Sequence, residues 1–148
     1  MRKIVNILLI SICTIFASPI FAGSLTDDLS NCLADNLTGK ERKSLAKWIF
    51  FAMAAHPEIS SYSSATQEDV LSSDKYVGKL ITRLLTVDCQ DKVRLAHSSD
   101  PLALQRAFEF VGQVAMQELM TNENVTKAIT NYGQFADTQM INETLSGK

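Results

Sequence analysis

The amino-acid sequence predicts an all-α fold, a single-domain bundle of about five helices in an orthogonal or up-down arrangement, with one disulfide. Apolar residues recur at helical spacing through most of the chain, and no segment shows the convincing alternation of a strand. Start signals for helices recur along the sequence. Two cysteines, Cys32 and Cys89, remain once an N-terminal export signal is set aside. Amphipathic helices joined by short connections are expected to bury one common core.

The first 22 residues have the pattern of a cleaved secretory signal peptide. Arg2 and Lys3 precede an apolar run over residues 4–16, and the small residue Ala22 stands before the expected cleavage point. The run is about half of the ~20 residues that a membrane-spanning helix needs. We therefore expect residues 23–148 to form one soluble domain without a membrane span. The expected location is the periplasm, with secretion as the alternative.

The charge balance argues against two classes of partner. The full chain carries 14 Lys and Arg against 16 Asp and Glu, a formal net charge of −2. Removal of Arg2 and Lys3 with the signal peptide makes it more acidic. A mildly acidic surface of mixed charges has no electrostatic reason to bind nucleic acid or anionic lipid. The expected partner is another envelope or secreted protein, and a homo-oligomer is left open.

The two remaining cysteines favour a disulfide, because an even pair in an exported protein meets an oxidising compartment. Closing a loop of roughly 58 residues stabilises a fold by roughly 4 kcal/mol on the chain-entropy model. The rival interpretation is two free thiols that bind a metal or act in redox chemistry. No C-x-x-C spacing supports it.

The first two predicted helices are adjacent in the sequence. The first covers about residues 26–36 and points Cys32 at the core. Thr38 and Glu41 form a T-x-x-E capping box that opens the second. It is expected to end at His56, before a proline that cannot donate a backbone N–H. Because it is apolar around most of its circumference, we expect this second helix to be the central element.

A third helix is predicted to run to His97. It begins either at a second box-like pair, Thr66 and Asp69, or at Ser73. Its core face, counted at 100° per residue, consists of Val70, Val77, Leu80, Ile81, Leu84 and Leu95. Cys89 lies on a flank with Gly78, which is expected to permit close approach of the first helix.

Two more helices complete the prediction. Asp100 at the N-cap and Pro101 at the first helical position start the fourth. Its stripe is Leu104, Ala107, Phe108, Val111, Val114, Ala115 and Leu119. Asn122 is expected to cap the fifth, with Gly133 as a weak point and a frayed tail from Asn142. The stripe of the fifth is Val125, Ala128, Ile129, Tyr132, Ala136 and Met140.

The two histidines are candidates for chemistry or for capping. His56 and His97 both fall at predicted helix C-termini, where an imidazole can bond free carbonyls and a cation is favoured by the dipole. This structural role explains both residues. The alternative is that they converge with Asp100 to hold a metal or to act in acid–base chemistry, as in a metal-assisted hydrolase.

Glu118 is the one acid inside an apolar stripe. A buried carboxylate must be paired, or its pKa must rise. The structural interpretation is that Glu118 reaches water or pairs with a basic residue such as Arg83 or Arg106.

Several large apolar residues lie off the main stripes. Trp48, Phe50 and Phe51 occupy nearby positions of the second helix and face different directions. Either that helix is fully buried, which we favour, or one of its sides opens onto a groove or a partner. Phe110, Met116 and Met120 give the fourth helix a second apolar flank. An exposed patch larger than a few hundred Å² would mark an interface or an apolar pocket.

The sequence contains no recognisable catalytic constellation, and no cofactor is expected. Our leading hypothesis is a non-enzymatic exported protein that binds another protein, as an adaptor, an inhibitor or an immunity protein does. The alternative is a carrier of a small apolar ligand between the second and fourth helices. A metal-assisted hydrolase is the third hypothesis.

Overall fold

The computed structural model describes residues 20–147, which are helical almost throughout and contain no strand. This confirms the predicted all-α class. The signal-peptide prediction concerns residues that lie largely outside the described range. The helices are α1 (Ile20–Asp35), α2 (Gly39–Ala54), α3 (Pro57–Ser60), α4 (Gln67–Arg83), α5 (Gln90–Ser99), α6 (Ala103–Met120), α7 (Glu123–Thr130) and α8 (Thr138–Leu145). A π-helical turn (Leu84–Asp88) follows α4, and a 3-10 turn (Asn131–Gln134) follows α7.

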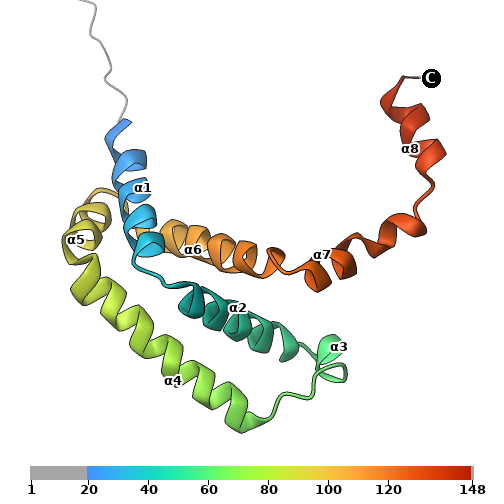
Figure 1. Ribbon diagram of the computed structural model, residues 1–148. Helices are drawn as coiled ribbons and strands as arrows, with labels where there is room; N and C mark the ends of the chain where they lie inside the picture. Colours follow the sequence, from blue (N-terminus) through green and yellow to red (C-terminus); the bar gives the residue numbers. More distant parts are fainter. Residues whose placement is uncertain (1–19, 148) are drawn as a thin grey trace, which may run out of the picture.

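Helices α1 to α6 form a packed unit, which we call the body, and residues 121–147 form an arm that leaves it (Figure 1). Helix α6 packs against α1, α2 and α5, while α2 lies between α6 and α4. The buried side of α6 consists of small residues, Ala103, Ala107, Val111 and Ala115. These allow close approach of α1, whose Leu29 and Leu33 are fully buried. The central element is therefore α6, and our prediction of the second helix was wrong.

Most of the predicted start signals are confirmed. Thr38 and Thr66 each form a capping box, with Glu41 and Asp69 respectively. Asn122 caps α7 and accepts the backbone N–H groups of its first turn. Asp100 accepts the N–H of Leu102 at 2.9 Å, although α6 itself begins only at Ala103. These local signals hold because each satisfies N–H groups that a helix leaves free at its start.

The predicted third helix is interrupted. The π turn takes in one residue more than an α turn, and Cys89 then leaves helical geometry with φ −123° and ψ 21°. As a result Ala96 is fully buried, whereas Leu95, predicted on the core face, is 51% exposed. Gly78 has no atom within 4 Å of the position of a Cβ, so it does not mediate the close approach that we predicted.

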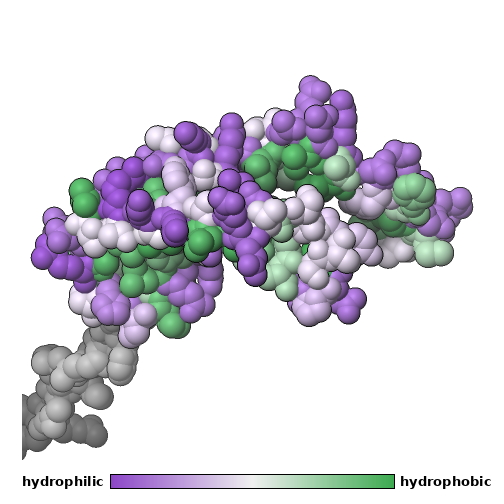
Figure 2. Space-filling model, turned by 90° about the horizontal axis from the view of Figure 1, so that it is seen from below, coloured by the Kyte–Doolittle hydropathy of each residue, from purple (hydrophilic) through white to green (hydrophobic). Residues whose placement is uncertain are grey.

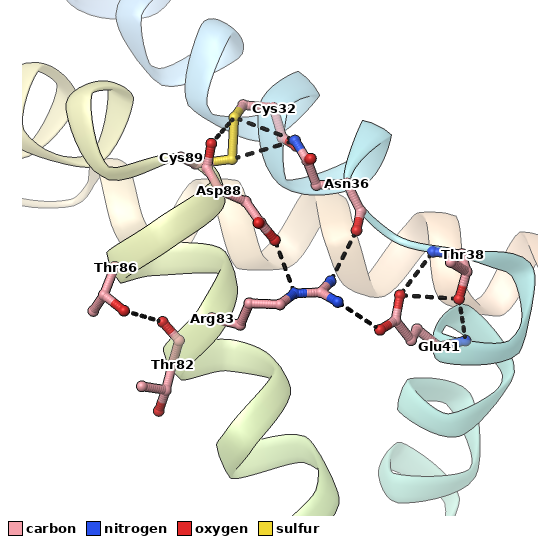
Figure 3. Close-up of polar contacts among 9 residues, drawn as sticks. All are labelled: Cys32, Asn36, Thr38, Glu41, Thr82, Arg83, Thr86, Asp88 and Cys89. Atoms are coloured by element: carbon pink, nitrogen blue, oxygen red, sulfur yellow. Dashed lines mark hydrogen bonds and ion pairs between the residues drawn. A yellow bond between two sulfur atoms is a disulfide. The ribbon is translucent and has the colours of Figure 1, made fainter.

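The junction after α4 ties three segments together (Figure 3). The predicted disulfide joins Cys32 of α1 to Cys89, with a Cα–Cα distance of 6.0 Å. Beside it, the Arg83 guanidinium lies 3.0 Å from a Glu41 oxygen, pairs with Asp88 at 2.8 Å and donates to the carbonyl of Asn36 at 3.0 Å. The covalent link and the ion-pair cluster hold α1, α2 and α4 at one point.

The C-terminal quarter differs from the prediction. One helix from Asn122 to Met140 was expected, but α7 ends at Thr130, Gly133 lies in the 3-10 turn, and Asp137 caps α8. Helix α8 also covers the tail that we expected to fray. Neither α7 nor α8 packs on α1 to α5 to any extent, and Figure 1 shows the arm extending beyond the end of α6. Within the described residues, no helix is long and apolar enough to cross a membrane.

Candidate functional site

The two histidines do not converge. His56 is the N-cap of α3 and not part of the last turn of α2, which ends at Ala54, so our placement was wrong. Its Nδ1 accepts the N–H of Glu58 at 3.2 Å. His97 lies in the last turn of α5, as expected of a helix end. Helix α4 separates the two, and its 17 residues span about 25 Å.

Asp100 does not join either histidine in a metal site. Its carboxylate pairs with Arg106 and caps the turn before α6. Among residues 20–147 there is no group of three His, Cys, Asp or Glu side chains that could hold a metal ion. The proposed hydrolase site is therefore not assembled in this part of the chain.

Glu118 is paired, but with other residues than those we named. Its carboxylate lies 3.9 Å from Arg42 and 3.7 Å from Lys43, both on α2, rather than beside Arg83 or Arg106. The end of α6 therefore lies beside the start of α2, which the sequence could not show. The pairing gives Glu118 a structural role in holding the two helices together.

Helix α2 is not surrounded, so the interpretation that we favoured was wrong and the open-sided alternative holds. Phe50 is exposed, Trp48 and Phe51 are half-buried, and the ammonium of Lys47 lies 5.8 Å from the Phe51 ring centroid. Phe110, Met116 and Met120 of α6 are also exposed. Figure 2 shows apolar side chains gathered in a patch on the body, bordered by hydrophilic residues.

A separate apolar cleft lies between three helices of the body. It is lined by Leu45, Trp48 and Ile49 of α2, Ile81 of α4, and Phe108, Val111 and Gly112 of α6. Its volume is about 230 Å³. The only polar group of these side chains is the Trp48 indole N–H, which donates to Asp74 at 2.8 Å. The cleft therefore offers an apolar surface without an unmet hydrogen bond, between the two helices that we expected to hold a ligand.

A second hollow, of about 440 Å³, lies between α1 and α6. Its lining is mostly polar and includes Asp27 and Asn31 beside Phe110. Arg106, its only basic residue, is already paired with Asp100. Because its basic residue is already paired, this hollow is a weaker candidate for a binding site than the cleft.

The arm is the other candidate surface. Helix α7 was expected to pack into the bundle, yet no side chain of residues 121–147 is buried. Its six large exposed apolar residues are Ile129, Tyr132, Phe135, Met140, Ile141 and Leu145. Figure 2 shows hydrophobic side chains also at the end of the molecule where the arm lies.

The polar groups of the arm satisfy one another locally. Lys127 pairs with Glu123 one turn away in α7, and Gln139 donates to Glu143 in α8. Asp137 accepts the N–H of Met140 at the start of α8. The apolar positions of α7 are spaced so that they form one face of the helix, and the charges of α7 lie on a different face. A partner can therefore cover the apolar surface of the arm without breaking the hydrogen bonds of these polar groups with water.

Sequence reasoning missed two features of these surfaces. The break in the arm had a signal, since Asp137 stands three residues before Met140 in the position of an N-cap. The residues that line the cleft had none: a ligand site between the second and fourth helices was expected, but Ile81 and Phe108 belong to the predicted core stripes and are only half-buried in the structure. No known family model, curated protein sequence or solved structure matches the chain.

Proposed function

We propose that the chain is an exported, non-enzymatic protein that acts by binding another protein, with the C-terminal arm as its principal binding surface. The observation that carries the proposal is the arm itself, which keeps a row of large apolar side chains in solvent. Exposed apolar patches of this kind mark interaction sites in soluble proteins. Helices of eight residues are marginal in water unless they pack against something.

Export is supported by the N-terminal pattern and by the Cys32–Cys89 disulfide, which is typical of an oxidising compartment. We place the protein in the periplasm, with secretion as the alternative. Mass spectrometry and N-terminal sequencing of the exported protein test this. We expect the chain to begin at Gly23, and an uncleaved N-terminus would contradict it.

An affinity capture tests the binding function. The oxidised chain beginning at Gly23 is immobilised and exposed to native envelope and secreted fractions, and retained proteins are identified by mass spectrometry. We expect a stoichiometric partner that Phe135→Asp fails to retain. Tyr62→Asp is the matched control, because Tyr62 is an equally exposed aromatic residue of the body. Equal retention by both variants, or no partner at all, would contradict the proposal.

A second candidate function is a carrier of a small apolar ligand in the cleft. It is favoured by a hollow of about 230 Å³ without an unmet polar group, since a cavity of about 150 Å³ already holds a benzene ring. Native mass spectrometry of the protein purified from its own source tests this candidate. We expect a mass excess that Gly112→Leu removes, and the bare polypeptide mass alone would exclude it.

A further inference from the structure

We propose that the cleft between α2, α4 and α6 receives the arm of a second copy of this chain, so that two copies exchange arms in a symmetric dimer. This inference rests on the proposed function and names the partner of the arm. Each chain carries one apolar cleft and one exposed apolar arm. A reciprocal exchange therefore occupies both surfaces of both copies, as the self-complementary interface of a twofold dimer requires.

The cleft and the arm match in size and in chemistry. The cleft, at about 230 Å³, has room for one aromatic side chain, because about 150 Å³ suffices for a benzene ring. The 3-10 turn and the residue after it offer two such side chains, Tyr132 and Phe135, which are 72% and 82% exposed. Aromatic residues seated in apolar pockets are the usual anchors of protein interfaces. The Trp48 N–H is already bonded to Asp74, so the incoming side chain needs no polar group.

The exposed area of the arm is sufficient for a stable contact. Aromatic side chains bury roughly 150–250 Å² each. Applied to all six large apolar residues, the middle of this range gives at most roughly 800 Å² of exposed surface, which is about the contribution of each partner to a standard interface. Two arms double this area in a symmetric exchange. Apart from the Tyr132 hydroxyl, the groups involved carry no charged or hydrogen-bonding atom, so desolvation opposes the contact little.

The direction of the arm favours a second copy over the chain's own cleft. At the hinge, Thr126 Oγ1 donates to the carbonyl of Met120 at 2.9 Å, and Thr121 Oγ1 donates to that of Glu118 at 2.7 Å. The Thr126 bond joins α7 to the end of α6, where α7 leaves the body (Figure 1). The chain's own cleft lies at Gly112, about 12 Å back along α6. Reaching it would require the arm to reverse at the junction of α6 and α7 and lose the Thr126 bond.

Sedimentation equilibrium of the purified oxidised protein, up to about 0.1 mM, tests the exchange. We expect a monomer–dimer equilibrium that Gly112→Leu weakens at least tenfold, because the new side chain fills the cleft. Gly78→Leu is the matched control and leaves the dimer intact, since Gly78 is also a helical glycine with open space around it but lies outside the cleft. Phe135→Asp together with Tyr132→Asp weakens the dimer, whereas Tyr62→Asp does not.

Mixing two impaired variants distinguishes exchange from other dimers. The Gly112→Leu chain keeps its arm, and the Tyr132→Asp/Phe135→Asp chain keeps its cleft. Their mixture should associate more strongly than either variant alone, through one restored contact. Circular dichroism shows whether each variant is folded, and because the two lesions lie far apart, either one suffices for a test.

Three results would overturn the proposal. A protein that stays monomeric over the whole concentration range has no exchanged arm. A dimer insensitive to Gly112→Leu indicates that two arms pair with each other instead, and a mixture no stronger than its components excludes reciprocity. If the chain is monomeric while Phe135→Asp still loses a foreign partner in the capture experiment, the binding function stands and only the second copy is excluded.

Discussion

In the body, the apolar face of α6 meets three other helices, whereas the apolar faces of α7 and α8 in the arm meet solvent. The two regions do not differ in amphipathic character. They differ in what ties distant segments together. The body has the Cys32–Cys89 disulfide, the Arg83 cluster and the Trp48–Asp74 hydrogen bond, all joining residues far apart in sequence.

The described side-chain hydrogen bonds of the arm are all local, joining residues at most six positions apart. An amphipathic pattern therefore says which face of a helix will be buried, but not what will bury it. In the body the partner is within the chain, and in the arm we propose that it is another chain.

Amide hydrogen exchange of the dilute protein should give the largest contrast. Amides of α6 such as that of Val111 should exchange only by global opening, which costs about 5–15 kcal/mol in a domain of this kind. Amides of Ile129 and Ile141 should open at a cost near zero. Protection of the arm should rise with protein concentration, because dimerisation covers it. Strong arm protection in dilute monomer would mean that the arm packs on its own body.

Removal of the disulfide should produce the next largest effect, confined to the body. The double variant Cys32→Ser/Cys89→Ser should lose roughly 4 kcal/mol of unfolding free energy on the chain-entropy model. Urea titration followed by Trp48 fluorescence measures it, and exchange rates of arm amides serve as the internal control. An unchanged urea midpoint would mean that the contacts of Arg83 with Glu41, Asp88 and Asn36 are sufficient to hold α1 against α4.

One substitution made in both regions sharpens the contrast. Leu33 is fully buried and Leu145 is 79% exposed. Leu33→Ala should destabilise the protein by about 2–5 kcal/mol, because it leaves a cavity in the core. Leu145→Ala should change the unfolding free energy of the monomer by less than about 0.5 kcal/mol. Similar losses at the two positions in dilute solution would contradict the division into body and arm.

The smallest predicted effect is the loss of stability at low pH through the protonation of Glu41. Partial burial raises the pKa of Glu41, but hydrogen bonds from Thr38 and the Arg83 guanidinium outweigh this and hold the pKa below its usual range. A pKa depressed in the folded state adds stability above the unfolded value of about 4.3, and that stability is lost as the pH falls through the folded value. Glu41→Gln should therefore cost up to about 1 kcal/mol at neutral pH, because the amide keeps the capping-box acceptor but loses the charge paired with Arg83.

The difference between Glu41→Gln and wild type should shrink towards zero in acid, where the wild-type carboxyl is protonated as well. Urea titrations at several pH values measure it. Glu143→Gln, in the arm, is the control and should stay within about 0.5 kcal/mol of wild type at every pH. A constant difference between Glu41→Gln and wild type would assign the loss to packing rather than charge.

Local features of this fold were predictable from sequence, whereas tertiary ones, apart from the disulfide, were not. The capping boxes at Thr38 and Thr66 and the stripe of α6 depend on residues three or four positions apart. The first box and the stripe were predicted correctly, and of the two predicted starts of the third helix the structure has Thr66 and not Ser73. The disulfide was predicted because two cysteines remain after the signal peptide and an exported protein meets an oxidising compartment. The partners of Glu118 and the open side of α2 depend on where helices meet, which no local pattern encodes. The packing of Leu95 failed because one π turn shifted every later position by one residue.

The π turn at Leu84–Asp88 also has a consequence for chain length. An α-helix that gains one residue can accommodate it as a π turn. The residues before and after the turn then keep facing the same directions, although the numbering after it is shifted by one. Val87 is exposed and lies within this turn. A chain lacking Val87 should close into a regular helix and still present Cys89 to Cys32. The same deletion inside α4 would rotate the residues after it by about 100° relative to those before it and separate Arg83 from Glu41. We therefore expect a single-residue deletion to be tolerated at this turn and to destabilise the fold one helix turn earlier.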